Sequence, residues 1–169
     1  MPKQWQRLCG ARVIDWTLKA FAGTPEITPL VVVLHPDDIA GFDVPDGVEV
    51  APGGATRAAW VLSGLRHLEG RGIDTVLIHD VARPCVTPET IRTVCAALET
   101  APAAAPALPV TDALWTGAKG RVTGTQDRAG LFRAQTPQGF HYELILKAHL
   151  NHTGEAADDV EVARAAGLD

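Results

Sequence analysis

The sequence predicts an α/β fold with a mostly parallel sheet, flanking helices and a protruding β-hairpin arm. Segments with strand-like and helix-like patterns alternate along almost the whole chain, which is typical of parallel sheets joined by helices. The apolar run at residues 75–79 is short and β-branched, as a buried parallel strand is. Residues 112–127 hold three glycines around a strand-like segment, which indicates a hairpin. A chain of 169 residues is expected to form one domain around one core.

Helices are expected where apolar residues recur at helical spacing or where a capping residue starts a periodic segment. The helix after residue 57 carries one apolar stripe, and Thr87-Pro88-Glu89 is a typical helix start. The predicted helices are residues 12–21, 58–68, 87–99, 141–151 and 157–166. The predicted strands are residues 30–34, 48–51, 74–79 and 103–108, and residues 131–140 are expected to return to the core. A linker is the alternative interpretation of the Ala- and Pro-rich residues 101–109.

Composition and charge exclude several classes of protein. The net charge of −5 argues against a general nucleic-acid surface, although a small phosphorylated ligand is compatible with it. No signal peptide and no apolar run of membrane-spanning length are found. The three cysteines fit neither a zinc site nor a disulfide framework, so we expect reduced thiols in a cytoplasmic protein. No nucleic-acid or membrane partner is expected.

The first candidate site lies where the strand at residues 74–79 ends. Asp80 and Arg83 follow it directly, and Pro84 forces the chain out of the sheet. Open α/β sheets bind ligands outside the carboxyl ends of their strands. A carboxylate there suits Mg²⁺, and an arginine suits phosphate. A structural ion pair that pins the loop is the alternative interpretation.

Other candidates are weaker when each is taken alone. Gly53-Gly54 lies between a strand and a helix, so it fits either a phosphate-binding turn or an ordinary tight turn, about equally. Thr136 precedes a proline and is expected to be extended, with its hydroxyl free for a ligand. By themselves, Lys3 and Arg128 are typical of solvated surface cations.

Taken together, the motifs resemble a known family over nearly the whole chain. The order and approximate spacing match the 2-C-methyl-D-erythritol 4-phosphate cytidylyltransferases, whose product is a cytidine-diphosphate intermediate of the non-mevalonate isoprenoid pathway. The segments that carry the resemblance are Pro2-Lys3-Gln4, Gly53-Gly54-x-x-Arg57, His79-Asp80-Val81-Ala82-Arg83-Pro84, Pro109-Val110-Thr111-Asp112, Asp127-Arg128-x-Gly130-Leu131 and Gln135-Thr136-Pro137-Gln138-Gly139-Phe140. The resemblance implies a Rossmann-like fold, with residues 1–169 forming a nucleotidyltransferase-type domain whose arm spans about 110–130.

The resemblance implies four catalytic residues. Lys3 would stabilise the charge that develops on the triphosphate of CTP. Asp80 would lie near the α-phosphate and bind its Mg²⁺. Arg83 would help hold the methylerythritol phosphate, and Arg128 would orient that phosphate for attack. The arm would exchange across a homodimer, so that Arg128 serves the partner subunit's site.

It also implies five substrate-binding residues. Gly53 and Gly54 would lie against the cytosine end of CTP, and Thr136 would line the pocket of the second substrate. Arg57 and Ala82 belong to the same motifs and are expected to contribute to the substrate site.

This sequence departs from the family's pattern at several places. The family has a strand and a glycine-rich, arginine-containing phosphate loop before the Pro-Lys-Gln segment, and a strand with a substrate-binding lysine near its end. Neither is found here, so we expect residues 1–169 to be incomplete at both ends. Trp60 occupies a position that usually holds a small serine, and Ala113 and Trp115 replace a usual threonine and lysine.

Three further hypotheses remain open from the sequence. The substrate could be another polyol phosphate, such as ribitol 5-phosphate. The chain could be a non-catalytic, dimerising remnant that lacks the nucleotide loop. It could also be one part of a bifunctional polypeptide that carries another enzyme of the pathway.

Overall fold

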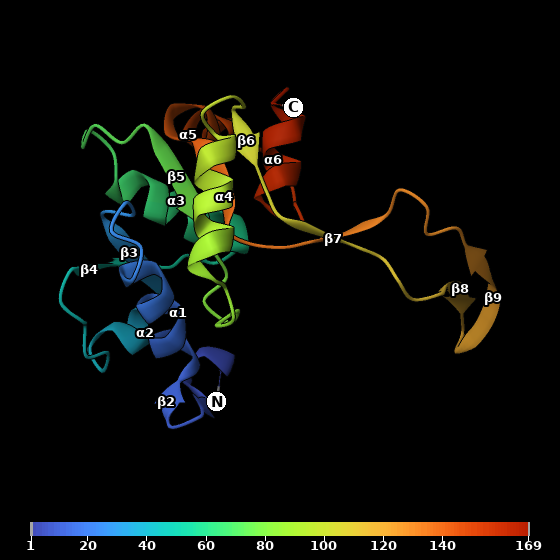
Figure 1. The fold of residues 1–169 in the computed structure, drawn as a ribbon, viewed down its shortest axis with the longest axis horizontal. Helices are drawn as coiled ribbons and strands as arrows, with labels where there is room; N and C mark the ends of the chain where they lie inside the picture. Colours follow the sequence, from blue (N-terminus) through green and yellow to red (C-terminus); the bar gives the residue numbers. More distant parts are fainter. Residues whose placement is uncertain (1, 169) are drawn as a thin grey trace.

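The computed structural model describes residues 2–168 and confirms an α/β fold with a projecting arm (Figure 1). Strands and helices form a body, and a long two-stranded arm leaves it on one side. None of the helices within residues 2–168 has the length and apolar character needed to cross a membrane.

The N-terminal half of the body is built around the one parallel strand pair of the described residues. Strand β3 (Leu30–Leu34) pairs with β4 (Val48–Pro52) in parallel, from Leu30 opposite Val48 to Leu34 opposite Pro52. The other elements of this half are the 3₁₀ helix η1 (Lys3–Trp5), β1 (Arg7–Leu8), β2 (Ala11–Arg12), α1 (Val13–Ala22), α2 (Pro36–Ile39) and α3 (Arg57–His67). The expected helices at 12–21 and 58–68 are therefore confirmed to within a residue or two.

The C-terminal half contains a three-stranded antiparallel sheet. Its order is β5 (Thr75–Ile78), β11 (Gln138–His141) and β6 (Ala103–Ala104), with β11 in the centre. Helices α4 (Pro88–Ala97), α5 (Tyr142–Asn151) and α6 (Asp159–Ala165) complete this half. The parallel arrangement expected from the sequence thus holds for β3 and β4, whereas β11 returns from the arm and runs against both of its neighbours.

A cavity separates the β3–β4 pair from the sheet of β5, β11 and β6. In the part of the chain that the structure describes, β3 pairs on one edge with β4, and β5 pairs on one edge with β11. A cavity of about 720 Å³ lies between them and is lined by Val31 and Val33 on one side and by Val76 and Ile78 on the other. The expectation that β5 is a buried strand was wrong: Thr75 is exposed and the rest of β5 is half-buried. Its second edge faces this cavity instead of another strand.

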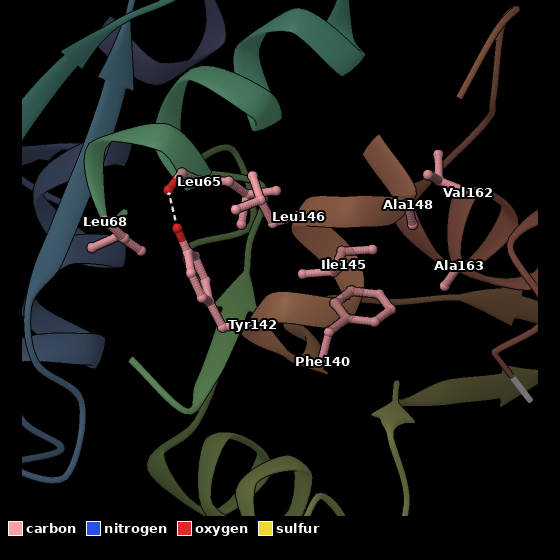
Figure 2. Close-up of a cluster of buried hydrophobic side chains, with 9 residues drawn as sticks. All are labelled: Leu65, Leu68, Phe140, Tyr142, Ile145, Leu146, Ala148, Val162 and Ala163. Carbon is pink, nitrogen blue, oxygen red and sulfur yellow. Dashed lines mark hydrogen bonds between the residues drawn. The ribbon is translucent and has the colours of Figure 1, made fainter. Parts of the chain in front are cut away.

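The larger core cluster joins α3, α5 and α6 to strand β11. Phe140 and Ile145 are completely buried in it, and Figure 2 shows them beside Ala163 of α6. The hydroxyl of Tyr142 donates a hydrogen bond of 2.8 Å to the carbonyl oxygen of Leu65 (Figure 2). The cluster fixes the start of α5 against the last turns of α3.

A second cluster lies under α1. Ile14 and Leu18 of α1 pack with Val32 of β3, and Trp5 and Val81 pack against the same group. Because Trp5 closes η1 and Val81 follows β5, this cluster brings the N-terminal segment next to the loop after β5.

The arm has a stalk and a tip. The stalk is β7 (Ala107–Pro109) paired with β10 (Phe132–Ala134), and the tip is the hairpin of β8 (Leu114–Ala118) and β9 (Arg121–Gln126). The expected hairpin at 112–127 is confirmed. The expected strand at 103–108 is split between β6 and β7, because the chain leaves the body there. Residues 131–134 are exposed on the stalk, so the core resumes only at residue 137.

Candidate active site

The loop after β5 carries the acid and the arginine that the sequence singled out. Nε of Arg83 donates to Oδ2 of Asp80 at 3.0 Å, and Nη1 of Arg83 donates to Oε1 of Gln135 at 2.9 Å. The side chains of Asp80 and Arg83 are each 44% exposed. An ion pair this exposed contributes about 0–1 kcal/mol, so a phosphate could replace Asp80 on the guanidinium at little cost. The structural ion pair therefore exists and leaves both groups accessible.

His79 and Thr136 form the inner wall of the same loop. Nε2 of His79 lies 3.1 Å from the carbonyl oxygen of Arg83, and an oxygen there can only accept, so Nε2 carries the proton. Burial lowers the pKa of His79 despite the hydrogen bond to the Arg83 carbonyl, which favours the neutral ring. Nδ1 is then an acceptor, and the Thr136 hydroxyl donates to it at 2.9 Å.

The same hydroxyl oxygen of Thr136 accepts the backbone N–H of Asp80 at 3.4 Å. The expectation of a free Thr136 hydroxyl was therefore wrong, because its hydrogen is used by His79. What remains is a lone pair that can accept from a ligand. This network ties the beginning of β11 to the end of β5.

The Gly53-Gly54 turn joins β4 to α3. The N–H of Gly53 donates to the Leu34 carbonyl at 2.6 Å, and the Trp60 indole N–H donates to the Gly54 carbonyl at 2.5 Å. A Cβ on Gly53 would lie 2.4 Å from the Trp60 ring. Trp60 thus packs directly on the turn, and only glycine permits that approach.

The first turn of α3 is open to solvent. Thr56 is the N-cap, and its hydroxyl accepts the backbone N–H of Ala59 at 3.2 Å. The N–H groups at a helix start, with the positive end of the helix dipole, favour anionic ligands. Arg57, the first residue of α3, pairs instead with Asp159 at 2.6 Å.

The other predicted site residues fall in three places. Ala82 is exposed in the loop that carries Asp80. Lys3 is exposed on η1, whose Trp5 packs on the same cluster as Val81. Arg128 lies on the arm, where its guanidinium donates to the carbonyl of Thr111. The structure therefore brings together the Asp80 loop and Thr136. Arg128 lies between β9 and β10, on the arm that projects from the body (Figure 1).

Asp80 is the residue expected to bind Mg²⁺. Within residues 2–168, no group of three or more His, Cys, Asp and Glu side chains is arranged to hold a metal ion. Mg²⁺ commonly binds one or two carboxylates and completes its shell with waters and substrate phosphates. An accessible single carboxylate fits that mode, in which the nucleotide supplies much of the coordination.

Sequence reasoning missed three residues that the structure connects to the site. His79 and Gln135 lie inside the motifs quoted above, so their neighbours gave a signal for them. Asp159 is completely buried. Its position in a pair of aspartates before a short helix gave no such signal, since that pattern is also that of an ordinary helix start.

Comparisons with known proteins agree with the family resemblance of the sequence motifs. The family model described as 2-C-methyl-D-erythritol 4-phosphate cytidylyltransferase matches residues 1–169. A relative of that name from Cereibacter sphaeroides is 58% identical over 174 residues, which cover 100% of this chain and 77% of the relative. A bifunctional enzyme IspD/IspF from Ruegeria pomeroyi is 59% identical over 170 residues, which cover 99% of this chain and 45% of that protein.

Solved structures give the same result. The 2-C-methyl-D-erythritol 4-phosphate cytidylyltransferase of Thermus thermophilus superposes with a TM-score of 0.85 at 34% identity, covering 99% of this chain and 81% of that one. A 4-diphosphocytidyl-2C-methyl-D-erythritol synthase has a TM-score of 0.87 at 30% identity, covering 98% and 81% respectively. The likeness extends over the body and the arm alike.

Proposed function

Because this chain belongs to the 2-C-methyl-D-erythritol 4-phosphate cytidylyltransferase family, we propose that it transfers a cytidylyl group from CTP to 2-C-methyl-D-erythritol 4-phosphate. A phosphate oxygen of the alcohol substrate attacks the α-phosphorus of CTP. A new P–O bond forms, the bond between the α- and β-phosphates breaks, and pyrophosphate leaves.

The observation that carries this proposal is the contact network of Asp80, Arg83, Gln135 and Thr136 outside the end of β5. Arg83 has a guanidinium that is open to solvent and held at Nη1 by Gln135, so it is oriented for an incoming phosphate. The start of α3 supplies N–H donors suited to the nucleotide.

In this proposal each residue has a physical role. Lys3 stabilises negative charge on the triphosphate, and Gly53 and Gly54 keep the turn beside the base free of side chains of its own, with the Trp60 ring packed on Gly53. Thr136 accepts a hydrogen bond from the second substrate. Asp80 would hold Mg²⁺, which neutralises charge on phosphoryl oxygens when it is bound. Cytoplasmic localisation is part of the proposal and is supported by three free thiols, at Cys9, Cys85 and Cys95.

The arm suits a homodimer. Trp115 is 69% exposed and Phe132 is 62% exposed, and both lie on the arm. Apolar groups this exposed on a projection favour contact with another protein surface. Arg128 lies on the same arm, between β9 and β10, so we assign it to the partner subunit's site.

The cavity between β3 and β5 supports the view that the domain is larger than residues 1–169. In the described residues, β3 and β5 each have an unpaired edge that faces this cavity, and the walls of the cavity are apolar. One further strand of about five residues, the length of β3, would fit between them. The relatives are longer than this chain, which covers 77% of the Cereibacter sphaeroides protein. We propose that a strand from a longer form of this polypeptide occupies the cavity.

Restoring that strand is expected to stabilise the protein. Expression from a longer reading frame that adds an apolar N-terminal strand should raise the thermal midpoint by about 5 °C or more, since about 1 kcal/mol shifts it by 2–4 °C in a domain of this size. Hydrogen exchange at the amides of Val31 and Val33 in β3 and of Thr75 and Leu77 in β5, which point away from the paired strands, should slow as well. An extension with the same composition but a central proline is the control. The proposal would be overturned if both extensions raised the thermal midpoint equally. It would also be overturned if the slower hydrogen exchange depended on protein concentration, because a second copy in a dimer would then protect these amides.

The proposed reaction is tested by mixing verified full-length protein with CTP, Mg²⁺ and 2-C-methyl-D-erythritol 4-phosphate. Pyrophosphate release is the expected result, with a CTP-dependent rise in thermal midpoint. Faster release with ribitol 5-phosphate would assign the other alcohol. A folded dimer with no release and no response to CTP would identify the non-catalytic remnant.

A further inference from the structure

The completely buried carboxylate of Asp159 joins three helices of the body. Oδ2 of Asp159 accepts from Nη2 of Arg57 at 2.6 Å, and Oδ1 accepts from Nη1 of Arg57 at 3.3 Å. Nε2 of the buried His149 lies 3.1 Å from the same Oδ1. Arg57 begins α3, Asp159 begins α6 and His149 lies on α5.

Gln138 connects the start of α6 to strand β11. Its Oε1 accepts the backbone N–H of Asp159 at 3.1 Å and that of Val160 at 3.3 Å. Its Nε2 donates to Oδ2 of Asp158 at 2.9 Å. Gln138 is two residues after Thr136, so the start of β11 and the start of α3 are held by one set of hydrogen bonds.

Asp159 and Arg57 are both charged, and each compensates the cost of burying the other. Burial opposes the charged carboxylate, but hydrogen bonds from His149 and Arg57 outweigh it, and the pKa of Asp159 is lowered. Burial also opposes the charge on Arg57, but the hydrogen bond to Asp159 and the attraction of the Asp159, Asp80 and Asp158 carboxylates together outweigh that cost, so the pKa of Arg57 is raised. Buried charges are tolerated only with such partners.

We propose that Asp159 is a positioning residue for nucleotide binding, which acts through Arg57 to hold the Gly53-Gly54 turn in place against the β11 segment that carries Thr136. Two donors of Arg57 are directed at Asp159 and its charge is neutralised there. Arg57 thereby fixes the position of the turn, and it contributes to the substrate site without contacting the substrate. The nucleotide part of this inference rests on the proposed function, whereas the positional part does not.

The chain contains a matched control at the other end of the same helix. Glu49 of β4 accepts from Arg71 at 2.7 and 2.8 Å and lies 2.7 Å from Nε2 of His67. This is again one carboxylate with an arginine and a histidine, but it is half-buried, and its partners His67 and Arg71 lie at and beyond the end of α3 opposite to Arg57. The pKa of Glu49 is lowered to about 2 by hydrogen bonds from Arg71 and His67.

The experiment compares Asp159→Asn with Glu49→Gln in the full-length protein by hydrogen exchange under native conditions. In Asp159→Asn, exchange at the amides of Gly53 and Ala59 should be at least tenfold faster. Amides of α4, such as that of the buried Val94, should change less than twofold. Glu49→Gln should leave Gly53 and Ala59 within twofold of the parent.

Steady-state kinetics give the second measurement. Asp159→Asn should raise the KM for CTP at least tenfold while kcat changes less than threefold, because the turn binds nucleotide and the groups at Asp80 are untouched. Arg57→Lys, which keeps the charge at Asp159, should give a smaller increase in KM than Arg57→Met. The comparison of these two Arg57 variants also provides the test if Asp159→Asn does not fold.

The results separate the two proposals. Equal acceleration of exchange at Gly53 and in α4 would show a general loss of stability and would overturn the positioning role, as would unchanged exchange at Gly53. A fall in kcat with an unchanged KM for CTP would overturn it as well. Failure of the proposed function is recognised separately, by absence of CTP binding and turnover in the parent protein.

Discussion

Replacing Asp80 with asparagine is expected to lower the rate of pyrophosphate release by about 100-fold or more. The substitution removes the charge that would hold Mg²⁺ against the α-phosphate, and such charge stabilisation is worth several kcal/mol, at about 1.4 kcal/mol per tenfold in rate. Asp80 also orients Arg83 through the 3.0 Å contact. The measurement is the steady-state rate at saturating CTP over a series of Mg²⁺ concentrations.

Asp37→Asn is the matched control for this experiment. The side chain of Asp37 is 90% exposed and its carboxylate lies 3.6 Å from His35, so the substitution removes one charge without touching the Asp80 loop. Its rate should remain within twofold of the parent. An Asp80→Asn protein that keeps its rate and its Mg²⁺ dependence would show that Asp80 only pins the loop.

Replacing Phe140 with alanine is expected to lower the free energy of unfolding by about 3–5 kcal/mol. Phe140 is completely buried in the cluster that joins α5 and α6 to β11 (Figure 2). The loss of transfer free energy and the cavity left behind act together. Urea denaturation followed by circular dichroism measures the change.

Phe132→Ala is the control, because it removes the same side chain from the exposed stalk of the arm. A change within about 0.5 kcal/mol is expected for a monomer, as for most surface substitutions. Equal losses for the two variants in dilute protein would contradict the assignment of Phe140 to the core. A loss at Phe132 that grows with protein concentration would instead support the dimer through the arm.

The local elements could be predicted from the sequence because their signals are local. The continuous apolar run gave β3 at Leu30–Leu34, and Thr87 with Pro88 gave the start of α4. The arm was predicted because glycines and a strand pattern mark a hairpin without reference to the rest of the fold. The short sequence motifs likewise placed Asp80 and Arg83 at a strand end.

Other features depend on residues that are distant in the sequence. The hydroxyl of Thr136 was expected to be free, but His79, 57 residues earlier, takes its hydrogen. The hydrophobic periodicity of a strand indicates which of its side chains are buried, but it does not indicate which strand lies beside it. The antiparallel pairing of β5 with β11 could therefore not be inferred.

The sequence by itself therefore determined the family, the elements and the short motifs of the site, because each is specified by neighbouring residues. Only the tertiary structure decided which groups those motifs meet. Arg57 pairs with Asp159, which is 102 residues away in the sequence. No sequence pattern around either residue predicts that the two form an ion pair. A buried charge needs a partner, but which partner it finds depends on how α3, α5 and α6 pack around β11.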